Sequence, residues 1–359
     1  MAFETGEISS ISQRRGNFMN KKLLGVIDAT TYYDDLKDLT THRSLAALPF
    51  AGRYRLIDFV LSSMVNSTIH SVAIFPKYQY RSLMDHLGSG KNWGLDRKRD
   101  GLFFFPSPNL DTPSAGIGSF SHFAANLDYL YKSTQEYAII ANCYTIFNMD
   151  FQPVLDRHIE MGCDITEICH NGQSLDMYLV KTSLLIELIE TRHQTGYTCM
   201  KDVVNGIVPF TLCTYEYLGL AYKVDSITAY YQTSMNILHP TVLENLFISS
   251  QPIFTKVKDE PPTQYQKEAV IKNAMVANGC IINGVVENSI ISRGVKIGKG
   301  TIIRNSIIMQ KCQIGDNCVI DSAILDKDVR VESGTFMNGS KEKPLVIRKG
   351  TVQGALMNS

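Results

Sequence analysis

Short apolar runs alternate with segments of helical periodicity along the first two thirds of the chain. The run from Leu23 to Ile27 is typical of a buried strand, and Leu56, Phe59, Val60 and Met64 then fall at helical spacing. Further strands are predicted at residues 70–75, 102–105, 137–141, 164–168, 177–180 and 209–217, and further helices at residues 80–87, 122–131, 151–161, 182–191 and 226–236. This alternation predicts an α/β domain with a mostly parallel, doubly wound sheet.

The hydrophobic pattern changes from Val276 onward, where small aliphatic residues recur in hops of six, six and five positions. Three series repeat with a period of 17 residues: Ile291, Ile308 and Leu325; Ile297, Ile314 and Val331; and Val286, Ile303 and Ile320. A chance amphipathic strand would instead repeat every second residue. One inward aliphatic residue per face, stacked at a fixed period, predicts a parallel β-helix built from hexapeptides.

These two patterns divide the chain of 359 residues into two domains. We expect the α/β domain at residues 19–248, a polar, proline-bearing linker at 249–272 and the β-helix at 273–359. Residues 1–18 have no apolar segment of the kind found in a secretory signal, so we expect a disordered extension or a cloning remnant there. The Pro-, Ser- and Gly-rich stretch 107–121 is expected to be mobile.

The 35 basic and 35 acidic residues balance, so the chain has no general attraction to nucleic acid or to a membrane surface. No apolar run approaches the roughly 18–20 residues that span a bilayer. Among the eight cysteines, Cys163, Cys169 and His170 form the one cluster that resembles a zinc site. No second pair of ligands accompanies it, so the sequence favours buried thiols in a reducing cytosol over zinc, and we expect a cytoplasmic protein.

The connection after the first strand is the place where an α/β domain normally holds nucleotide phosphates on backbone N–H groups. Here residues 29–35 read ATTYYDD and contain no glycine. Asp34 and Asp35 repel a polyphosphate, and Tyr32 and Tyr33 crowd it. The predicted scaffold is therefore that of a nucleotide site, but the residues of this connection are unsuited to binding a polyphosphate.

The segment that follows carries the most specific local pattern in the chain. Residues 48–59 read LPFAGRYRLIDF, and residues 61–67 and 78–86 continue the pattern. This stretch resembles the bacterial ADP-glucose pyrophosphorylases (glucose-1-phosphate adenylyltransferases), and with the hexapeptides the likeness covers nearly all of residues 19–340. The resemblance implies a Rossmann-like nucleotidyltransferase domain followed by a left-handed parallel β-helix. It also implies enzymes that join glucose 1-phosphate to ATP with Mg²⁺, releasing pyrophosphate and making ADP-glucose for glycogen synthesis.

The departures from the family pattern fall on its catalytic positions. The glycine-rich phosphate loop corresponds to Thr30–Leu36, with Asp35 in place of an arginine, and a lysine of the family is replaced by Leu45. The two metal-binding aspartates are replaced by Tyr144 and Lys223. Each lost charge contact to a developing polyanion typically lowers the rate by about 10²–10³. We therefore expect little or no catalysis and no metal bound by this chain.

Two further observations concern the same site. A segment of the family that grips the sugar phosphate has no counterpart, because only a short polar loop separates Ile168 from Met177. Asp150 and Asp225 lie near the former metal positions and are the alternative carboxylates for a shifted site, although solvated loop residues are the default interpretation.

His42, Arg43, Arg53 and Arg55 stand in a stretch that, in the family, lines a regulatory site for phosphorylated metabolites. Arginines held by a loop suit bidentate recognition of phosphate. The competing interpretation is that these are surface arginines that pair with acids such as Asp58. We predict an effector site at these four residues.

The combination resembles the regulatory, non-catalytic type of subunit in this family. We therefore predict that this chain forms a hetero-oligomer, expected to be a tetramer, with a catalytic ADP-glucose pyrophosphorylase subunit that holds the Mg²⁺. The alternatives are an active nucleotidyltransferase that uses a shifted site and a stand-alone sensor of phosphorylated metabolites.

Overall fold

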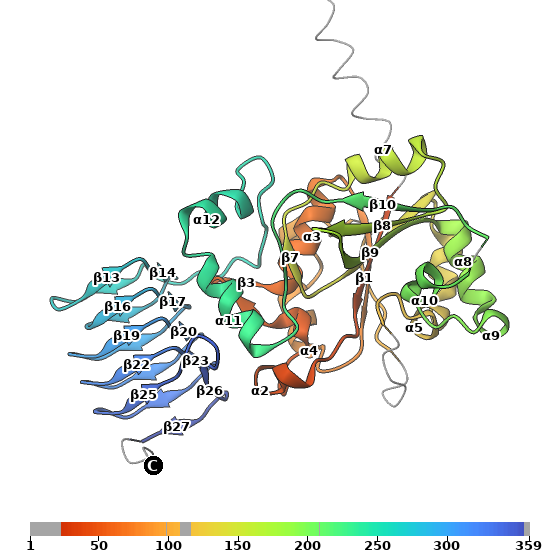
Figure 1. Cartoon of the computed structure of the whole chain (residues 1–359). Helices are drawn as coiled ribbons and strands as arrows, with labels where there is room; N and C mark the ends of the chain where they lie inside the picture. The colour runs from red at the N-terminus through yellow and green to blue at the C-terminus, as the bar shows by residue number, and fades with distance from the viewer. Residues whose placement is uncertain (1–22, 98, 108–115, 208, 355–359) are drawn as a thin grey trace, which may run out of the picture.

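The computed structural model of the chain describes residues 23–97, 99–107, 116–207 and 209–354. The predicted extension at residues 1–18 lies outside the described residues, as does the stretch 108–115 of the segment that we expected to be mobile. Figure 1 shows an α/β domain on the right and a coil of stacked strands on the left. The fold class predicted from the sequence is confirmed.

The α/β domain is built on one seven-stranded sheet with the order β10-β8-β9-β6-β1-β4-β5. Its strands are β1 (Leu23–Ala29), β4 (Ser71–Pro76), β5 (Gly101–Phe104), β6 (Tyr137–Asn142), β8 (Ile165–His170), β9 (Gln173–Lys181) and β10 (Leu212–Glu216). Only β9 runs antiparallel to its neighbours, so the sheet is mostly parallel as predicted. β1 is an interior strand, paired with β4 and β6, and both of its faces are buried.

Helices cover both faces of this sheet. Leu23 and Ile27 point into a core shared with α3, α4 and α7, whereas Leu24 and Val26 point into a core shared with α5, α8 and α10. The α-helices of this domain are α2 (Lys37–Thr40), α3 (Leu56–Asn66), α4 (Arg81–Leu87), α5 (Phe120–Ala124), α6 (Leu127–Lys132), α7 (Gln152–Glu160), α8 (Thr182–Glu190), α9 (Arg192–Thr195), α10 (Met200–Asn205), α11 (Ile227–Asn236) and α12 (Pro240–Leu246). Short 3₁₀ turns occur at η2 (Asp34–Leu36), η3 (Leu45–Ala47) and η4 (Lys91–Trp93), and small paired strands at β2 (Pro49–Phe50) with β3 (Tyr54–Arg55) and β7 (Thr145–Phe147) with β11 (Ala221–Lys223).

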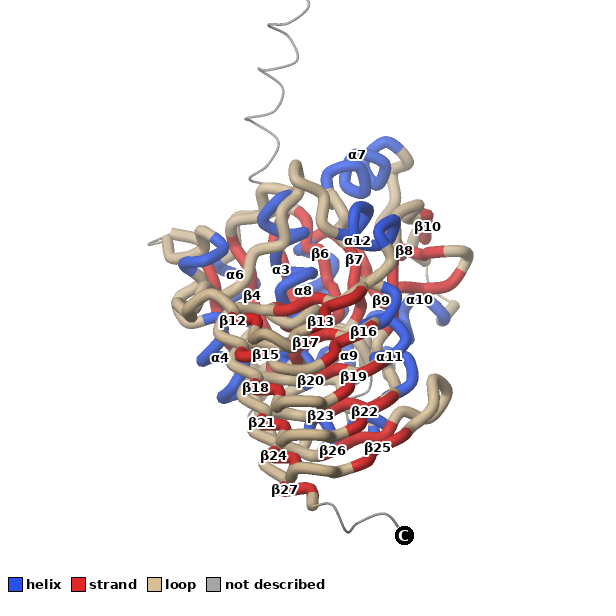
Figure 2. Tube along the Cα trace, turned by 90° about the vertical axis from the view of Figure 1, so that its left-hand side faces the viewer, coloured by secondary structure: helices blue, strands red, loops and turns tan. Residues whose placement is uncertain are grey.

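The second domain is a left-handed parallel β-helix with three sheets. One sheet contains β12 (Gln264–Tyr265), β15 (Ile281–Ile282), β18 (Lys296–Ile297), β21 (Gln313–Ile314), β24 (Arg330–Val331) and β27 (Val352–Gln353). The second contains β13 (Val270–Lys272), β16 (Val285–Glu287), β19 (Ile302–Arg304), β22 (Val319–Asp321) and β25 (Phe336–Asn338). The third contains β14 (Met275–Val276), β17 (Ile290–Ile291), β20 (Ile307–Ile308), β23 (Ala323–Leu325) and β26 (Leu345–Ile347). Figure 2 views these rungs from the side of the coil.

The 17-residue series found in the sequence form the interior of this coil. Ile291, Ile308 and Leu325 are direct register partners, as are the members of the other two series, and all of these side chains are buried. The coil begins earlier than predicted, because β12 and β13 fall within residues 249–272, which we assigned to the linker. Strands of two or three residues have too short a pattern to separate the first rung from a linker.

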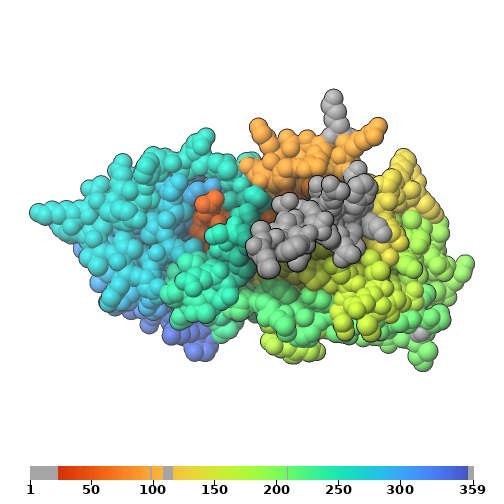
Figure 3. All heavy atoms as spheres, turned by 90° about the horizontal axis from the view of Figure 1, so that it is seen from above, coloured from red at the N-terminus to blue at the C-terminus, as the bar shows by residue number. Residues whose placement is uncertain are grey.

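The two domains are in extensive contact through α11 and the third sheet of the coil. Outward-facing Ile307 and Ile324 belong to the hydrophobic core of the α/β domain. Tyr231 of α11 donates a hydrogen bond of 2.5 Å to the carbonyl oxygen of Asn305 in the coil. The view from above shows the coil in cyan and blue packed against the α/β domain, with the teal segment around α12 at their junction (Figure 3).

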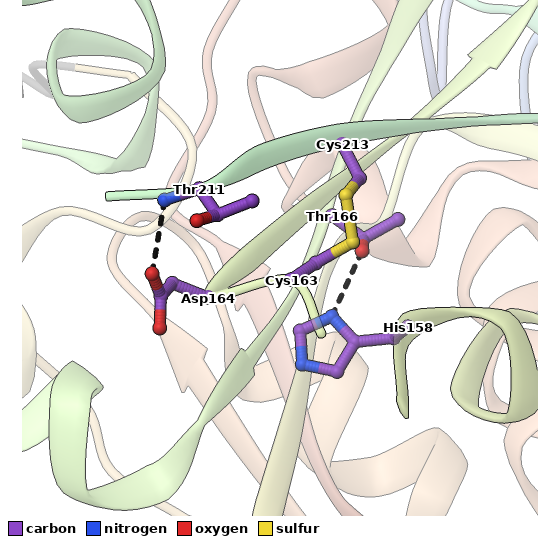
Figure 4. Close-up of a disulfide and its surroundings, with 6 residues drawn as sticks. All are labelled: His158, Cys163, Asp164, Thr166, Thr211 and Cys213. Atoms are coloured by element: carbon purple, nitrogen blue, oxygen red, sulfur yellow. Dashed lines mark hydrogen bonds between the residues drawn. A yellow bond between two sulfur atoms is a disulfide. The ribbon is translucent and has the colours of Figure 1, made fainter. Parts of the chain in front are cut away.

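The cysteine prediction is wrong at two positions. Cys163 and Cys213, which we expected to be free thiols, form a disulfide (Figure 4). The other six cysteines are free and buried. Cys163 precedes β8 and Cys213 lies in β10, and these two strands are neighbours in the sheet. No helix within the described ranges is long and apolar enough to cross a membrane.

Candidate functional site

At the carboxyl end of β1, the side chain of Asp28 binds backbone and hydroxyl groups that follow the strand. Asp28 is fully buried and its Oδ1 accepts hydrogen bonds from the backbone N–H of Thr30 at 2.9 Å and from the Thr30 hydroxyl at 2.6 Å. Its other oxygen accepts from the N–H of Gly118 at 2.8 Å. The Thr30 N–H therefore points inward to a carboxylate, so it is not available to a phosphate.

The residues after Thr30 form a 3₁₀ turn that places negative charge where a phosphate loop would place amides. Asp34 and Asp35 occupy the first turn of η2 and are exposed, so the charge reversal predicted at Asp35 faces solvent. Leu45 is 3 % exposed in η3 and lines a cavity of about 430 Å³ at this end of β1, together with Tyr32, Lys37 and Tyr78. This cavity retains room for a small ligand, but a neutral leucine stands where the resemblance places a lysine.

Tyr144 and Lys223, the two residues at the former metal positions, meet on one carboxylate. The hydroxyl of Tyr144 donates to Oδ2 of Asp176 at 3.0 Å, and Nζ of Lys223 lies 2.6 Å from the same oxygen. Nζ of Lys223 also lies 5.5 Å from the centroid of the Tyr144 ring. The ring of Tyr33 packs edge-on against Tyr144 with centroids 5.4 Å apart. Four side chains from separate parts of the sequence therefore form one closed polar cluster.

Protonation within this cluster opposes metal binding. Burial strongly raises the pKa of the Tyr144 hydroxyl, and the negative charge of Asp176 raises it further, so the phenol keeps its proton. Burial alone would lower the pKa of Lys223, but the hydrogen bond and charge of Asp176 outweigh that effect and raise it. The ammonium group neutralises the carboxylate that a cation would need.

The cluster does not fit a divalent cation. Mg²⁺ is held by carboxylates and other oxygen ligands, whereas this cluster offers one carboxylate, already bound to an ammonium group and a phenol. No group of three His, Cys, Asp or Glu side chains suited to a metal occurs in the described part of the chain, including the Cys163, Cys169 and His170 cluster. The Asp150 carboxylate accepts from the N–H of Gln152 at the start of α7, and Asp225 lies near Lys223 without completing a ligand set.

Asp176 was missed by the sequence interpretation. β8 and β9 are joined by a two-residue turn, Asn171-Gly172, in which both residues have positive φ (51° and 70°). Asn-Gly is a strong signal for such a hairpin, so the short loop noted between Ile168 and Met177 could have been identified from the sequence. The side chain of Asp176 is positioned by an irregularity in the register of β8 and β9, and Asp176 itself has a φ of 52°. No simple sequence pattern indicates that register shift.

A second candidate site is a basic cavity between the domains, formed by two adjoining pockets of about 320 and about 170 Å³ that share Arg53, Lys258 and Arg293. The hairpin of β2 and β3 brings Arg53 and Arg55 to it, and at its tip Gly52 (φ 74°) lies close to Ile291 of the coil. Lysines and arginines from three parts of the chain line the basic cavity: Arg53, Arg55, Lys256, Lys258, Arg293, Lys311 and Lys327.

Burial, together with repulsion between neighbouring cations, lowers the pKa of several groups in the basic cavity. Burial, together with the charges of Arg55 and Arg43, lowers the pKa of Lys327 to about 7. Burial lowers the pKa of Arg55 to about 10, and the pKa values of Lys258 and Arg293 are lowered by burial and by neighbouring arginines. Asp328 lines the cavity and Glu260 lies near Arg293, but cations outnumber these carboxylates. Such a cluster favours an anion.

The four residues predicted for an effector site do not all line the same cavity. Arg53 and Arg55 line the basic cavity, and the guanidinium of Arg55 donates to the Ser82 carbonyl at 2.6 Å. Asp58 does not pair with that guanidinium. It accepts from the backbone N–H of Arg55 and lies 2.6 Å from Nε2 of His86.

Arg43 and His42 lie outside the lining of the basic cavity. Arg43 is 2 % exposed and its guanidinium is held by Asp326 at 2.8 Å and by the carbonyl of Leu39. His42 is exposed and does not line the basic cavity. The buried Arg43 therefore joins the two domains through Asp326, and it lines the 430 Å³ cavity at the end of β1, not the basic cavity.

The remaining basic residues were missed although the sequence contained a signal for some of them. The 17-residue period places Arg293, Gln310 and Lys327 at equivalent corners of successive rungs, and the three line the basic cavity. The side-chain oxygen of Gln310 is buried and makes no hydrogen bond within the described ranges. Extending the periodicity from the inward aliphatic residues to the corners would have predicted this column.

Comparison with known proteins agrees with both domains. Residues 34–175 match the nucleotidyl transferase family, and residues 261–343 match the GlmU-like, C-terminal hexapeptide family. The glycogen biosynthesis protein GlgD of Geobacillus stearothermophilus is 60 % identical over 342 residues, covering 95 % of this chain and 100 % of the relative. GlgD of Bacillus subtilis (strain 168) is 54 % identical over 341 residues, covering 95 % and 99 %. A glucose-1-phosphate adenylyltransferase of Bacillus cereus is 28 % identical over 349 residues, covering 85 % and 92 %. The chain therefore belongs to the family of the glycogen biosynthesis protein GlgD, and it is more distantly related to the glucose-1-phosphate adenylyltransferases.

Proposed function

We propose that this chain is a regulatory, catalytically impaired subunit that modulates a catalytic glucose-1-phosphate adenylyltransferase in glycogen biosynthesis. The observation that carries the proposal is the cluster of Tyr144, Asp176 and Lys223 at the former metal positions. An ammonium group on the remaining carboxylate excludes a divalent cation, and the acidic turn at Asp34 and Asp35 repels a triphosphate. The intact scaffold leaves assembly and regulation as its role.

The regulatory input is a phosphorylated metabolite bound in the basic cavity. Arg53, Lys258 and Arg293 come from the α/β domain, the linker and the coil, so one anion would contact three segments at once. Phosphate groups suit such a site because they accept several charge-assisted hydrogen bonds. Binding of an anion would also offset the repulsion between cations that, after burial, contributes to the lowered pKa values of these groups.

A short path joins the basic cavity to the mouth of β1. Lys327 lines the cavity and directly follows Asp326, whose carboxylate binds Arg43 across the domain interface. Arg43 in turn lines the 430 Å³ cavity at the end of β1. An anion at Lys327 therefore acts on the contact that fixes the two domains relative to each other, which is how an effector would alter a partner subunit in a hetero-oligomer.

The test of impaired catalysis uses the purified chain alone with ATP, glucose 1-phosphate and Mg²⁺. We expect no ADP-glucose formation above background, and turnover near that of the catalytic subunit would overturn the proposal. The catalytic subunit is then assayed with and without this chain over a range of effector concentrations. A changed substrate affinity or effector response is expected, and identical curves would argue against a regulatory role.

The assignment of the basic cavity is tested by two variants and a matched control. Arg53→Ala and Lys258→Ala should each weaken the binding of sulfate, used as a probe for the phosphate group, by about tenfold, since each removes a charge contact. Arg330→Ala removes an exposed arginine from the first sheet of the coil and should leave binding unchanged. Equal binding by all four proteins would place the effector elsewhere.

A stand-alone sensor of phosphorylated metabolites is the second candidate, favoured by a basic cavity that is lined within one chain. Copurification with a catalytic adenylyltransferase from the native cell would exclude it. The active enzyme with a shifted site is the third candidate, and Asp225 is its remaining carboxylate near Lys223. The assay of the chain alone decides that candidate.

A further inference from the structure

The three sheets of the coil differ in the side chains that they present outward. On the third sheet the outward positions form an apolar column of Met275, Ile290, Ile307, Ile324 and Val346. Ile290, Ile307 and Ile324 are 1 %, 3 % and 0 % exposed, because the α/β domain covers this sheet. An apolar outer column on this coil thus coincides with a protein contact.

The second sheet also has an apolar outer column, but nothing in the described part of the chain covers it fully. Its members are direct register partners: Val270, Val285, Ile302, Val319 and Phe336. Val270 is 53 % exposed and Phe336 is 49 % exposed. The first sheet, by contrast, presents Gln264, Ile281, Lys296, Gln313, Arg330 and Val352, a mostly polar set. Figure 2 shows the first and second sheets on the side of the coil away from the α/β domain.

A ladder of charges runs beside this apolar column. The next outward position on each rung is occupied by Lys272, Glu287, Arg304, Asp321 and Asn338, so the charge alternates in sign over four rungs and ends at a neutral residue. Within the chain, Oε1 of Glu287 lies 3.3 Å from Nζ of Lys272, and Oε2 of Glu287 lies 3.4 Å from Nε of Arg304. We call the apolar column and the charge ladder together the outer face.

The order of charges makes the outer face complementary to itself. A two-fold axis that lies in the interface and runs parallel to the strands superposes the apolar column of one copy on that of the other and reverses the order of the ladder. The four charged residues of one copy, which alternate from positive to negative, then each face a residue of opposite charge on the second copy. Lys272 would face Asp321 of the second copy, and Glu287 would face Arg304.

Other arrangements of two outer faces are unfavourable. Shifting the register so that all five rungs overlap places Arg304 against itself and Glu287 against Asp321, which are like-charge contacts. A parallel arrangement either brings the apolar column of one copy onto the charge ladder of the other, or packs the two apolar columns together and leaves the two ladders unpaired at opposite edges. Among these arrangements, the antiparallel register of four rungs alone packs apolar residues on apolar residues and also pairs every charge with an opposite one, and it leaves the fifth rung, with Phe336 and Asn338, outside the contact.

We propose that the outer face binds the outer face of a second copy of this chain, antiparallel and centred between Glu287 and Arg304. Val285 packs on Ile302 and Val270 on Val319 across the two-fold axis. Rungs lie about 4.8 Å apart, so four of them make a contact below the standard interface size, and we expect a dissociation constant in the micromolar range. The proposal does not depend on the regulatory role, because it concerns the full chain by itself.

The experiment is analytical ultracentrifugation of the full chain from about 1 to about 200 µM, a range that brackets the expected dissociation constant. Arg304→Glu sets two glutamates against each other across the axis, and Glu287→Arg sets two arginines against each other. Each variant alone should weaken the dimer by about tenfold or more. Mixing the two variants in equal amounts should restore it, because each glutamate of one then faces an arginine of the other.

The mixture separates contact between chains from an effect on folding, since both variants keep their intrachain repulsion in it. Surface ion pairs of this kind contribute little to stability, so each variant should remain folded. Arg330→Glu on the first sheet is the matched control and should dimerise like the unmodified chain. A monomer at every concentration would overturn the proposal, and so would a dimer that both single variants leave intact or a mixture that stays monomeric. If the outer face binds the catalytic subunit instead, the single variants should lose the hetero-oligomer while the unmodified chain alone stays monomeric. That result would also overturn the proposal.

Discussion

Nζ of Lys223 lies 2.6 Å from Oδ2 of Asp176, and the hydroxyl of Tyr144 donates to the same oxygen. This contact joins β11, the β8–β9 hairpin and the loop after β6 at the point where the related enzymes are expected to hold a metal ion. The substitutions at positions 144 and 223 are therefore complementary to each other, not merely losses. A lysine without Asp176 would be a free cation, and Asp176 without the lysine would be a nearly buried, unpaired carboxylate.

The double variant Tyr144→Asp with Lys223→Asp should recover little activity. It supplies two carboxylates at the former metal positions, but the acidic turn at Asp34 and Asp35 would still repel a triphosphate and the Thr30 N–H still binds Asp28. We expect ADP-glucose formation within about tenfold of the unmodified chain, measured with ATP, glucose 1-phosphate and Mg²⁺. Recovery by more than about a thousandfold would mean that the loop does not limit catalysis.

Asp176→Ala should lower the free energy of unfolding by about 1–3 kcal/mol, mainly because it leaves the buried Tyr144 hydroxyl without its acceptor. The ion pair itself contributes little, since the Lys223 side chain is 39 % exposed. Urea unfolding measures the change. Asp259→Ala, at an exposed carboxylate, is the control and should change stability by less than about 0.5 kcal/mol. Equal stability of the two variants would show that the cluster is not structural.

Most of the fold followed from the sequence because its signals are local and repeated. The 17-residue period fixed the interior of the coil, and buried apolar runs fixed β1, β4 and β6. The sequence could not give the partners of Asp176, which depend on the register of β8 and β9. It also could not give the Cys163–Cys213 disulfide, because residues 50 positions apart meet only when β10 lies beside β8.

The same distinction explains the basic residues. Arg53 and Arg55 were predicted from a local motif and line the basic cavity, but Arg43 from the same stretch is buried against Asp326, 283 positions away. Whether an arginine faces solvent or the other domain depends on how the domains pack, which no local pattern contains. Lys258, Arg293 and Lys327 join Arg53 for the same reason.

Arg43→Ala should destabilise the chain strongly. It leaves Asp326, which is 2 % exposed, as an uncompensated charge at the domain interface, an effect of about 3–5 kcal/mol. Arg348→Ala is the matched control, because Arg348 also bridges the domains, to Asp38, but is exposed, so its loss should change stability by at most about 1 kcal/mol. Denaturant unfolding followed by circular dichroism measures both variants. Similar values for the two would mean that burial of the Arg43 pair has no energetic consequence.

The disulfide should be detected by counting thiols. Alkylation of the denatured chain without reductant is expected to label six of its eight cysteines, and prior reduction should expose all eight. Cys213→Ser should then lower stability by about 2–4 kcal/mol, since the bond closes a loop of 50 residues. Cys169→Ser, at a free buried thiol, should keep the bond. Eight labelled cysteines without reductant would refute the pairing.

The affinity of the basic cavity for anions should fall as the pH rises through neutrality. Lys327 has a pKa of about 7 in the folded chain, lowered by burial and by Arg55, Arg43 and Lys258, with Asp326 opposing. An anion binds the protonated form more tightly, so binding is strongest below pH 7. Because the folded-state pKa of Lys327 is lowered, its effect on stability is opposite to that of a lysine whose pKa is raised by an ion pair. Between the folded pKa and the ordinary value of 10.5 the unfolded chain binds more protons, so the anion-free chain gains stability as the pH rises.

Sulfate is the suitable probe, because its charge is constant in this range whereas that of phosphate changes. We expect the rise in melting temperature caused by sulfate to shrink from about pH 6 to about pH 8.5, as the proton leaves Lys327. Lys327→Met should remove most of that pH dependence, and it should stabilise the anion-free chain below pH 7 because a repelled charge is gone. Lys296→Met, at an exposed lysine on the first sheet, should retain the dependence of the unmodified chain. A sulfate effect that is independent of pH, or one that Lys327→Met leaves unchanged, would mean that this lysine does not face the bound anion.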